Sequence, residues 1–377
     1  MSTSLLLVFG VAAFLAYANG SNDVSKGIAT LVGSGVTDYR RAMAWGTAWT
    51  AVGGLLAAVL GRAMLATFGD GLLEPGTTPS FAAALAALMG AAAWVLLATR
   101  MGLPVSTTHA LVGSLAGVAA TAYGVGAMRW SALGGKVFLP LLVSPLASFL
   151  LTGLVLRTFR GRGGVAEKAD CLCAEVGPAM VVAGTTSAAS AALVPGAVSL
   201  RITTGATESC AAAQSKTVRL TLDHLHWLSS GMTSLARGLN DAPKMVALGL
   251  AASTLVPQSA SGARPLFVLV ALGMVAGSLW TGRRVTHLLA EKVTVMDHHE
   301  GLAANVVTAV LVATGAIYGL PMSTTHVSAG GIVGAGMQRS SLNRKALRDI
   351  VLAWLVTLPA AAFLGMAGYA LARAVLE

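Results

Sequence analysis

The feature that most constrains the fold is an internal duplication. The segment GSNDVSK at 20–26 reappears as GLNDAPK at 238–244, and LPVSTTHALVGSLAG at 103–117 reappears as LPMSTTHVSAGGIVG at 320–334. The first motif recurs after 218 residues and the second after 217, so both copies keep the same order and spacing. Self-similarity at a fixed period indicates a structure assembled from repeated units. We therefore expect two copies of one folding unit.

The chain is too apolar for a water-soluble surface. Only 11% of its residues are charged and its mean hydropathy is +0.74, whereas soluble proteins carry about 25% charged residues. A helix that crosses a membrane needs about 20 largely apolar residues. The segments that approach this requirement are 4–36, 42–61, 80–99, 103–122, 137–156, 228–252, 265–282, 302–319, 320–337 and 350–372. The sequence thus predicts an all-α polytopic membrane protein with about ten crossings.

The number of segments in each copy predicts how the copies are related. Each copy has about five, and the fifth carries a proline in its middle, Pro145 or Pro359. An odd number of crossings makes the second copy enter the membrane from the opposite side. We expect two inverted-topology repeats with broken or re-entrant half-helices, at 1–157 and 228–377, joined by a linker with some strand content at 158–227. This architecture is typical of secondary transporters with a midplane site.

The basic residues predict the orientation. With the N-terminus outside, 17 of them fall in inside loops and 5 in outside regions or at span edges, in agreement with the positive-inside rule. The linker would then be cytoplasmic, both termini would lie outside, and Cys171, Cys173 and Cys210 in the linker would be reduced. Because the basic residues lie between apolar segments rather than on one face, the net charge of +10 does not indicate nucleic-acid binding.

The first duplicated motif places carboxylates inside apolar segments. Of the 15 acidic residues, only Asp23 and Asp241 lie there, preceded by Asn22 and Asn240. A charge at mid-bilayer costs about 2.5–3.5 kcal/mol on insertion scales, so such residues face a cavity or a partner. We expect the helix to break here and its oxygens to form a site for Na⁺ or a proton. The alternative is a polar brace that joins the two copies.

The second motif predicts a helix that begins inside the membrane. Pro104 and Pro321 suit a chain break, and the Ser and Thr residues that follow are good N-caps. The N-terminus of a helix attracts anions through its free N–H groups and its dipole. Two such ends would hold a tetrahedral oxyanion together with the hydroxyls of Ser106, Thr107, Thr108, Ser323, Thr324 and Thr325. The alternative is simple capping of a kinked helix.

Two further symmetric pairs accompany these motifs. Lys26 and Lys244 follow each Asn by four residues, one helical turn along the same face. Each lysine would attract the anion, neutralise the nearby aspartate in place of a cation, or extend its ammonium to the membrane interface. His109 and His326 would relay a proton or donate to the anion, or merely bond to a neighbouring carbonyl.

One basic residue inside an apolar segment has no basic counterpart in the other copy. Arg237 lies three residues before Asn240, and Asn19 occupies the equivalent place in the first copy. Because the two copies differ at this position, Arg237 is a weaker candidate for the binding site than the lysine pair.

GSNDVSKGIA, GLNDAPKMVA, PVSTTH and PMSTTH resemble the duplicated signatures of the inorganic phosphate transporter (PiT) family, and the resemblance covers both halves outside the linker. It implies a homodimeric symporter of phosphate, driven by Na⁺ or H⁺, with no other cofactor. Phosphate would lie between the two Ser-Thr-Thr elements. The coupling cation, including Na⁺, would be bound at Asn22, Asp23, Asn240 and Asp241.

The chain departs from this family at Lys26. Many members have a neutral residue there, and a fixed positive charge beside a Na⁺ site repels the ion. Our hypothesis is that Na⁺ coupling is weakened or lost at one site, which leaves H⁺ coupling or a single Na⁺.

Three other functions fit part of the sequence. A sulfate transporter would also use two helix ends, but sulfate has no O–H group for Asp23 or Asp241 to accept, so the carboxylates favour phosphate. An intramembrane aspartyl protease would need a Gly-x-Gly-Asp element, whereas each aspartate here follows an asparagine. A passive channel would not show saturable, cation-dependent uptake.

Overall fold

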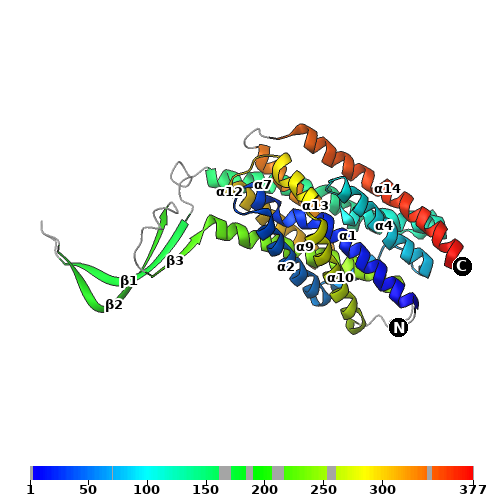
Figure 1. The fold of residues 1–377 in the computed structure, drawn as a ribbon, viewed down its shortest axis with the longest axis horizontal. Helices are drawn as coiled ribbons and strands as arrows, with labels where there is room; N and C mark the ends of the chain where they lie inside the picture. Colours follow the sequence, from blue (N-terminus) through cyan, green and yellow to red (C-terminus); the bar gives the residue numbers. More distant parts are fainter. Residues whose placement is uncertain are drawn as a thin grey trace.

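The computed structural model of the protein describes residues 3–69, 71–160, 171–183, 190–205, 216–252, 260–337 and 342–376. These residues form a bundle of helices from which a three-stranded sheet extends (Figure 1). Both termini lie at one end of the bundle, and the sheet leaves it at the other end (Figure 1).

The two copies contain the same succession of long helices. The first copy consists of α1 (Thr3–Gly33), α2 (Tyr39–Leu60), α3 (Arg62–Gly69), α4 (Phe81–Arg100), α5 (Thr107–Tyr123), a 3₁₀ turn η1 (Val125–Ala127), α6 (Trp130–Ala132), a π-helix η2 (Leu133–Phe138) and α7 (Leu139–Arg160). The second consists of α9 (Leu222–Ala252), α10 (Ala260–Thr281), α11 (Arg283–His287), a π-helix η3 (Leu288–Lys292), α12 (His298–Ile317), α13 (Thr324–Met337) and α14 (Arg344–Leu376).

Among the described residues, seven helices are long and apolar enough to cross a membrane. They correspond to seven of the segments predicted from the sequence, and α5, α9 and α13 correspond to the other three. The helices α5 and α13 are only 17 and 14 residues long, and α9 is 31 residues long but carries a polar motif in its middle. The prediction of a helical membrane protein with several spans is therefore confirmed, and the strands lie in the segment between the copies.

The helices that carry the two Asn-Asp motifs, α1 and α9, run antiparallel. Asn19 on α1 donates from Nδ2 to Oδ2 of Asp241 at 3.1 Å. Further along α1, Oγ1 of Thr30 lies 3.1 Å from Nε2 of His226. Residue numbers thus rise along α1 as they fall along α9, which is the course that inverted repeats require.

Packing between the copies is reciprocal. The helix α1 packs on α10 and α9 packs on α2, while α5 packs on α14 and α13 on α7. Equivalent glycines allow the last two contacts: a Cβ on Gly113 would meet the backbone of Leu358, and one on Gly330 would meet the backbone of Pro145. Small residues permit this close approach in membrane proteins, where apolar burial does not drive helix association.

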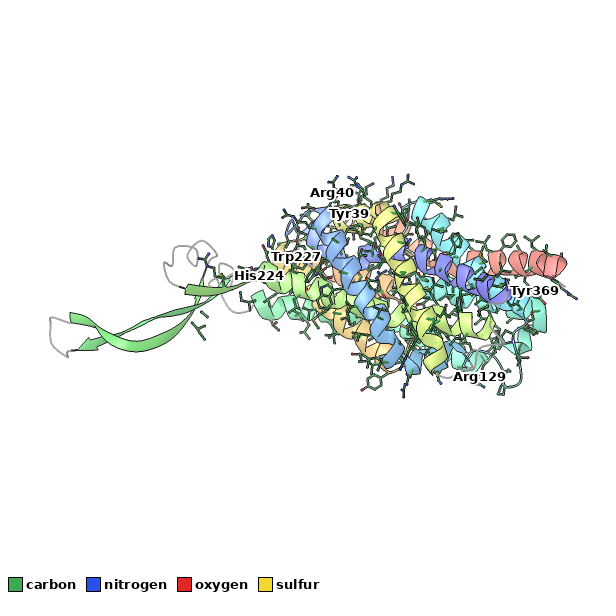
Figure 2. All side chains as sticks on the ribbon, turned by 60° about the horizontal axis from the view of Figure 1, so that its bottom comes forward. Tyr39, Arg40, Arg129, His224, Trp227 and Tyr369 are labelled. Atoms are coloured by element: carbon green, nitrogen blue, oxygen red, sulfur yellow. The ribbon has the colours of Figure 1, made fainter. Side chains whose placement is uncertain are left out.

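The segment between the copies forms an antiparallel sheet in the order β2-β1-β3. Its strands are β1 (Cys171–Ala183), β2 (Ser190–Gly205) and β3 (Lys216–Thr221), so the expected strand content is present. Cys171 is buried, and Cys210 lies outside the described residues. Figure 2 places Arg40 and His224 toward the strand end of the bundle and Arg129 toward the opposite end.

Candidate functional site

The Asn-Asp motifs lie within unbroken helices. The sequence predicted a break at each motif, and this was wrong: α1 continues through Asp23, and α9 continues through Asp241 and Pro243. The asparagine side chains do not compete for the backbone of their own helix. Asn22, for example, donates from Nδ2 to Oγ1 of Thr99 at 2.9 Å and to the carbonyl of Leu103 at 2.9 Å. These distant partners leave the helical hydrogen bonds intact.

The Ser-Thr-Thr-His motifs do begin half-helices, as predicted. Ser106 caps α5, with its Oγ accepting from the backbone N–H of His109 at 3.2 Å. Ser323 stands in the same relation to α13 and accepts from the N–H of His326 at 3.2 Å. Each helix is preceded by a non-helical stretch that contains the motif proline. Both short helices therefore start within the bundle.

The two half-helices meet at their N-terminal ends. Thr325 donates to the carbonyl of Val105 at 2.7 Å, and Thr108, its counterpart, approaches the carbonyl of Met322 at 3.5 Å. The rings of His109 and His326 stack with centroids 4.6 Å apart. Motifs separated by more than 200 residues in the sequence thus share one location.

Around Asp23 lies a group of polar residues that we call the first cluster: Asn19, Asn22, Asp23, Lys26 and Thr107. Lys26 donates from Nζ to Oδ1 of Asp23 at 2.6 Å and to Oδ1 of Asn22 at 2.6 Å. The other carboxylate oxygen accepts from Nδ2 of Asn19 at 2.7 Å and from Oγ1 of Thr107 at 2.8 Å. Both oxygens of this carboxylate are therefore bonded.

The equivalent residues of the other half form the second cluster: Arg237, Asn240, Asp241, Lys244 and Thr324. Here Lys244 lies farther from the carboxylate, with Nζ 3.2 Å from Oδ1 of Asp241. Asn240 donates from Nδ2 to the same oxygen at 2.8 Å. Asn240 Oδ1 and Thr324 Oγ1 are buried and make no hydrogen bond in the described part of the chain. The second cluster is less saturated than the first.

The two clusters are buried and joined to each other. Lys26 is 0% exposed and Lys244 1%, which excludes an ammonium that extends to the membrane interface. Asn19 bonds to both aspartates, and Lys244 donates to Thr108 of the first half at 2.7 Å. Buried charges persist where partners surround them, and each ammonium here lies directly beside a carboxylate. The polar brace considered from the sequence is thus present.

Most of the predicted anion-binding hydroxyls already have partners. Five of the six bond to the capping N–H groups, to Asp23 or to carbonyls of the opposite half. Ser323 also lies 2.6 Å from Nδ1 of His326. The sixth hydroxyl, that of Thr324, has no hydrogen-bond partner among the described residues.

Sequence reasoning gave too little weight to Asn19 and Arg237. Both are 0% exposed, and Asn19 links the two aspartates directly. Among the described residues, Arg237 donates from Nη2 to Oγ1 of Thr50 at 2.6 Å, whereas its Nε and Nη1 have no hydrogen-bond partner. The sequence could have indicated both residues, because they occupy equivalent positions about one helical turn before each Asn-Asp motif.

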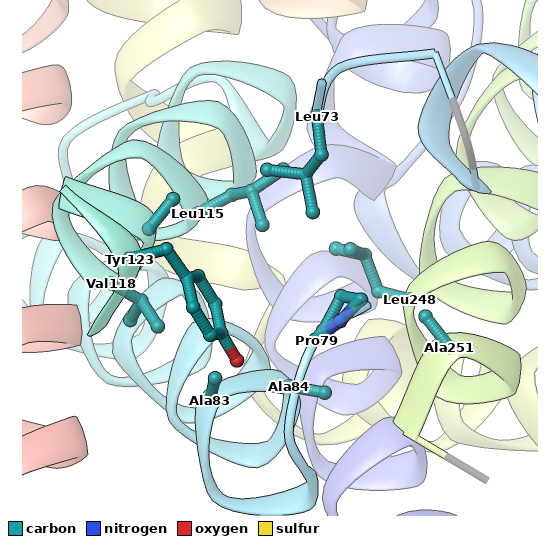
Figure 3. A pocket seen from close by; sticks show the side chains of 10 residues that line it. Leu73, Pro79, Ala83, Ala84, Leu115, Val118, Tyr123, Leu248 and Ala251 are labelled. Carbon is teal, nitrogen blue, oxygen red and sulfur yellow. The ribbon is translucent and has the colours of Figure 1, made fainter. Parts of the chain in front are cut away.

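Two hollows lie away from the clusters. One is apolar and is lined by residues that include Leu115, Tyr123 and Leu248 (Figure 3). The other is lined by Arg283, Arg284 and further residues of α1, α2 and the α11–η3 segment. Within the described residues, no group of three or more His, Cys, Asp or Glu side chains is placed to hold a metal ion.

Known proteins resemble this chain along nearly its whole length. The sequence profile of the phosphate transporter family matches residues 19–365. The chain is 30% identical to the chloroplastic inorganic phosphate transporter 2-1 of Arabidopsis thaliana, over 96% of this chain and 70% of that protein. It is also 30% identical to a Mycobacterium bovis protein named as a probable low-affinity inorganic phosphate transporter, with 97% and 77% covered. The solved structure of a sodium-dependent phosphate transporter has the same fold, with a TM-score of 0.76, 21% identity and 100% of both chains covered.

Proposed function

Because the chain belongs to the phosphate transporter family, whose members are transporters and not enzymes, we propose that it carries inorganic phosphate across a cell membrane as a cation-coupled symporter. The observation that carries the proposal is the meeting of the two half-helix ends beside buried cations. Helix N-termini bind anions through unpaired N–H groups and the helix dipole. Here two such ends, those of α5 and α13, lie together.

Phosphate would be held in the space shared by these ends. The proposed ligands are the first-turn N–H groups of α5 and α13, helped by the lysines and by hydroxyls that exchange their present partners when phosphate enters. The proposed residues are Ser106, Thr107, Thr108, Ser323, Thr324, Thr325, Lys26 and Lys244. His109 and His326 stack beside this space and are the proposed proton relay.

The coupling cation would act at Asn22, Asp23, Asn240 and Asp241. In this structure the ammonium groups of Lys26 and Lys244 already bond to the two carboxylates. A Na⁺ ion would have to displace an ammonium and overcome its repulsion. We therefore propose coupling to H⁺ or to a single Na⁺, a conclusion that extends the sequence-based hypothesis from the first half to both.

Transport requires the site to open alternately to each side. The site residues are buried, so this conformation is closed around the clusters. In the proposed cycle, one bundle that includes α5 or α13 moves against the rest, as in other transporters with inverted repeats. The sheet end would face the cytoplasm and both termini would lie outside. A homodimer remains a prediction.

Uptake of labelled phosphate into proteoliposomes tests the function. Gradients of Na⁺ and of pH are imposed separately, with unlabelled phosphate and sulfate as competitors. We expect saturable uptake that either the pH gradient or the Na⁺ gradient stimulates. Unlabelled phosphate should inhibit this uptake and sulfate should not. A Hill coefficient near two for Na⁺ would refute the proposed role of the lysines. Absence of phosphate uptake under every gradient, or equal inhibition by sulfate, would refute the phosphate assignment.

A further inference from the structure

We propose that phosphate binds asymmetrically, against the second cluster, and that Arg237 is its principal charged ligand. This inference rests on the proposed function and goes beyond the symmetric site that the duplicated motifs suggest. Three observations carry it: the unpaired nitrogens of Arg237, the balance of buried charge, and the position of the unpaired oxygens in the two halves.

Arg237 is the largest side chain that is fully buried in the described part of the chain. A guanidinium has five N–H donors in a fixed planar arrangement. Within the part of the chain that the structure describes, Nη2 bonds to Oγ1 of Thr50, while Nε and Nη1 have no partner. A buried charged group without partners is strongly destabilising. Nη2 carries a second N–H, and together with the open N–H of Nε or of Nη1 it forms the fork by which guanidinium groups bind an oxyanion in a bidentate manner.

The buried charges do not cancel without a ligand. The two clusters contain three basic side chains, those of Lys26, Lys244 and Arg237, and two carboxylates. The carboxylates bond to the lysines, and Arg237 interacts with both of them only through space. One positive charge therefore stays unmatched at Arg237. Monovalent dihydrogen phosphate would neutralise this charge.

The halves differ in which polar atoms are free. In the first cluster Oδ1 of Asn22 accepts from Lys26 and from the N–H of Val105, and the hydroxyl of Thr107 bonds to Asp23. Their counterparts in the second cluster, Oδ1 of Asn240 and the hydroxyl of Thr324, are unpaired. Apart from Oδ1 of Asn19, the open hydrogen-bonding capacity of the two clusters thus lies on the second half.

These open atoms belong to one neighbourhood. Arg237 and Asn240 are three residues apart and lie on one face of α9. Asn240 also donates to the carbonyl of Met322, two residues before Thr324. The amide orientation of Asn240 is fixed, because its Nδ2 has two acceptors, the Asp241 carboxylate and that carbonyl. Its free atom is therefore an acceptor, Oδ1.

This set matches protonated phosphate in particular. Arg237 and Thr324 offer donors to the unprotonated oxygens, and Oδ1 of Asn240 accepts from a P–OH group. Oδ1 of Asn19, which is also buried and unpaired, offers a second acceptor. Sulfate has no O–H group at working pH, so these amide oxygens would stay unpaired against it. Sites that leave polar groups unpaired reject such analogues strongly.

The test compares phosphate binding by full-length protein carrying Arg237→Asn or Arg237→Lys. The first change places in the second half the residue that stands at Asn19 in the first. We expect Arg237→Asn to weaken binding of labelled inorganic phosphate roughly 10- to 100-fold, since a hydrogen bond to a charged group contributes about that factor. Arg237→Lys keeps the charge but not the paired donors, and should show an intermediate loss.

A melting curve with and without inorganic phosphate separates binding from a structural role. A ligand raises the melting temperature through mass action. We expect the phosphate-induced rise to shrink in both variants while wild-type protein keeps it. Wild-type affinity in Arg237→Asn would overturn the proposal, and if that variant does not fold, unchanged affinity in Arg237→Lys would do so. Wild-type protein that does not bind phosphate would instead overturn the proposed function itself.

Discussion

The two halves of the site have the same residues at most positions but use them differently. In the first cluster both oxygens of the Asp23 carboxylate are bonded, with Lys26 at 2.6 Å. In the second the ammonium of Lys244 lies 3.2 Å from Asp241, and three side chains keep unpaired atoms. The first cluster is therefore nearly saturated, with Oδ1 of Asn19 left unpaired, whereas the second keeps unpaired atoms on three of its side chains. The difference at Asn19 and Arg237 adds a positive charge to the second half.

Removing either carboxylate should have the largest effect. Asp23→Asn leaves the buried ammonium of Lys26 without its ion pair, and breaking a buried pair from one side costs about 3–5 kcal/mol. Asp241→Asn should cost less stability, because the ion pair that it breaks is longer, 3.2 Å against the 2.6 Å between Lys26 and Asp23. We expect coupled phosphate uptake to be abolished in both, and the melting temperature to fall more in Asp23→Asn. Wild-type uptake in either folded variant would count heavily against the assignment of the site.

Two equivalent threonines offer a sharper comparison. Thr107→Val removes a hydroxyl that donates to Asp23 and accepts from Asn19, and should lower stability by about 1–3 kcal/mol. Thr324→Val removes an unpaired hydroxyl, so the protein without ligand should keep its stability and phosphate affinity should fall.

The comparison is measured as chemical or thermal unfolding without phosphate, and as phosphate binding, in both variants. Equal loss of stability in Thr107→Val and Thr324→Val would contradict the asymmetry. So would unchanged phosphate affinity in Thr324→Val.

Substitutions at equivalent packing positions should affect the two halves more equally than substitutions in the polar clusters do. Gly113→Ala places a methyl group against the backbone of Leu358, and Gly330→Ala places one against Pro145. Overpacking of this kind typically costs about 1–3 kcal/mol. We expect similar falls in melting temperature for both variants. Gly10 is exposed and has open space around it, so Gly10→Ala serves as the control and should not destabilise the protein. A large difference between the two buried variants would show that packing is asymmetric too.

Among the features that the two copies of the duplicated motifs share, the half-helices were predicted correctly from the sequence. The half-helices at Ser106 and Ser323 followed from local capping chemistry, which acts over a few residues. The helix break at the Asn-Asp motifs was predicted wrongly, because the preference of Asn and Asp for local backbone bonds was weighed without their partners. Those partners, such as Thr99 for Asn22, lie on other helices and come from tertiary packing.

Arg237 illustrates the limit of reasoning from symmetry. Because Arg237 has no counterpart in the first copy, it ranked below the lysines as a site residue when only the sequence was considered. In the structure it is fully buried and has unpaired nitrogens, which makes it the stronger candidate. Which donors remain free depends on the hydrogen bonds that all surrounding groups make, and these are known only once the three-dimensional structure is known. The sequence did offer one signal: next to a duplicated motif, the two copies carry different polar residues, Asn19 and Arg237.

The most direct measurement is an experimental structure of the protein with bound phosphate. We expect phosphate at the joined N-terminal ends of α5 and α13, within hydrogen-bonding distance of the free nitrogens of Arg237 and of Oγ1 of Thr324. Phosphate bound equally by Thr107 and Thr324 without contact to Arg237 would contradict the asymmetry. Phosphate bound only at the hollow beside Arg283 and Arg284, away from both helix ends, would contradict the shared site itself.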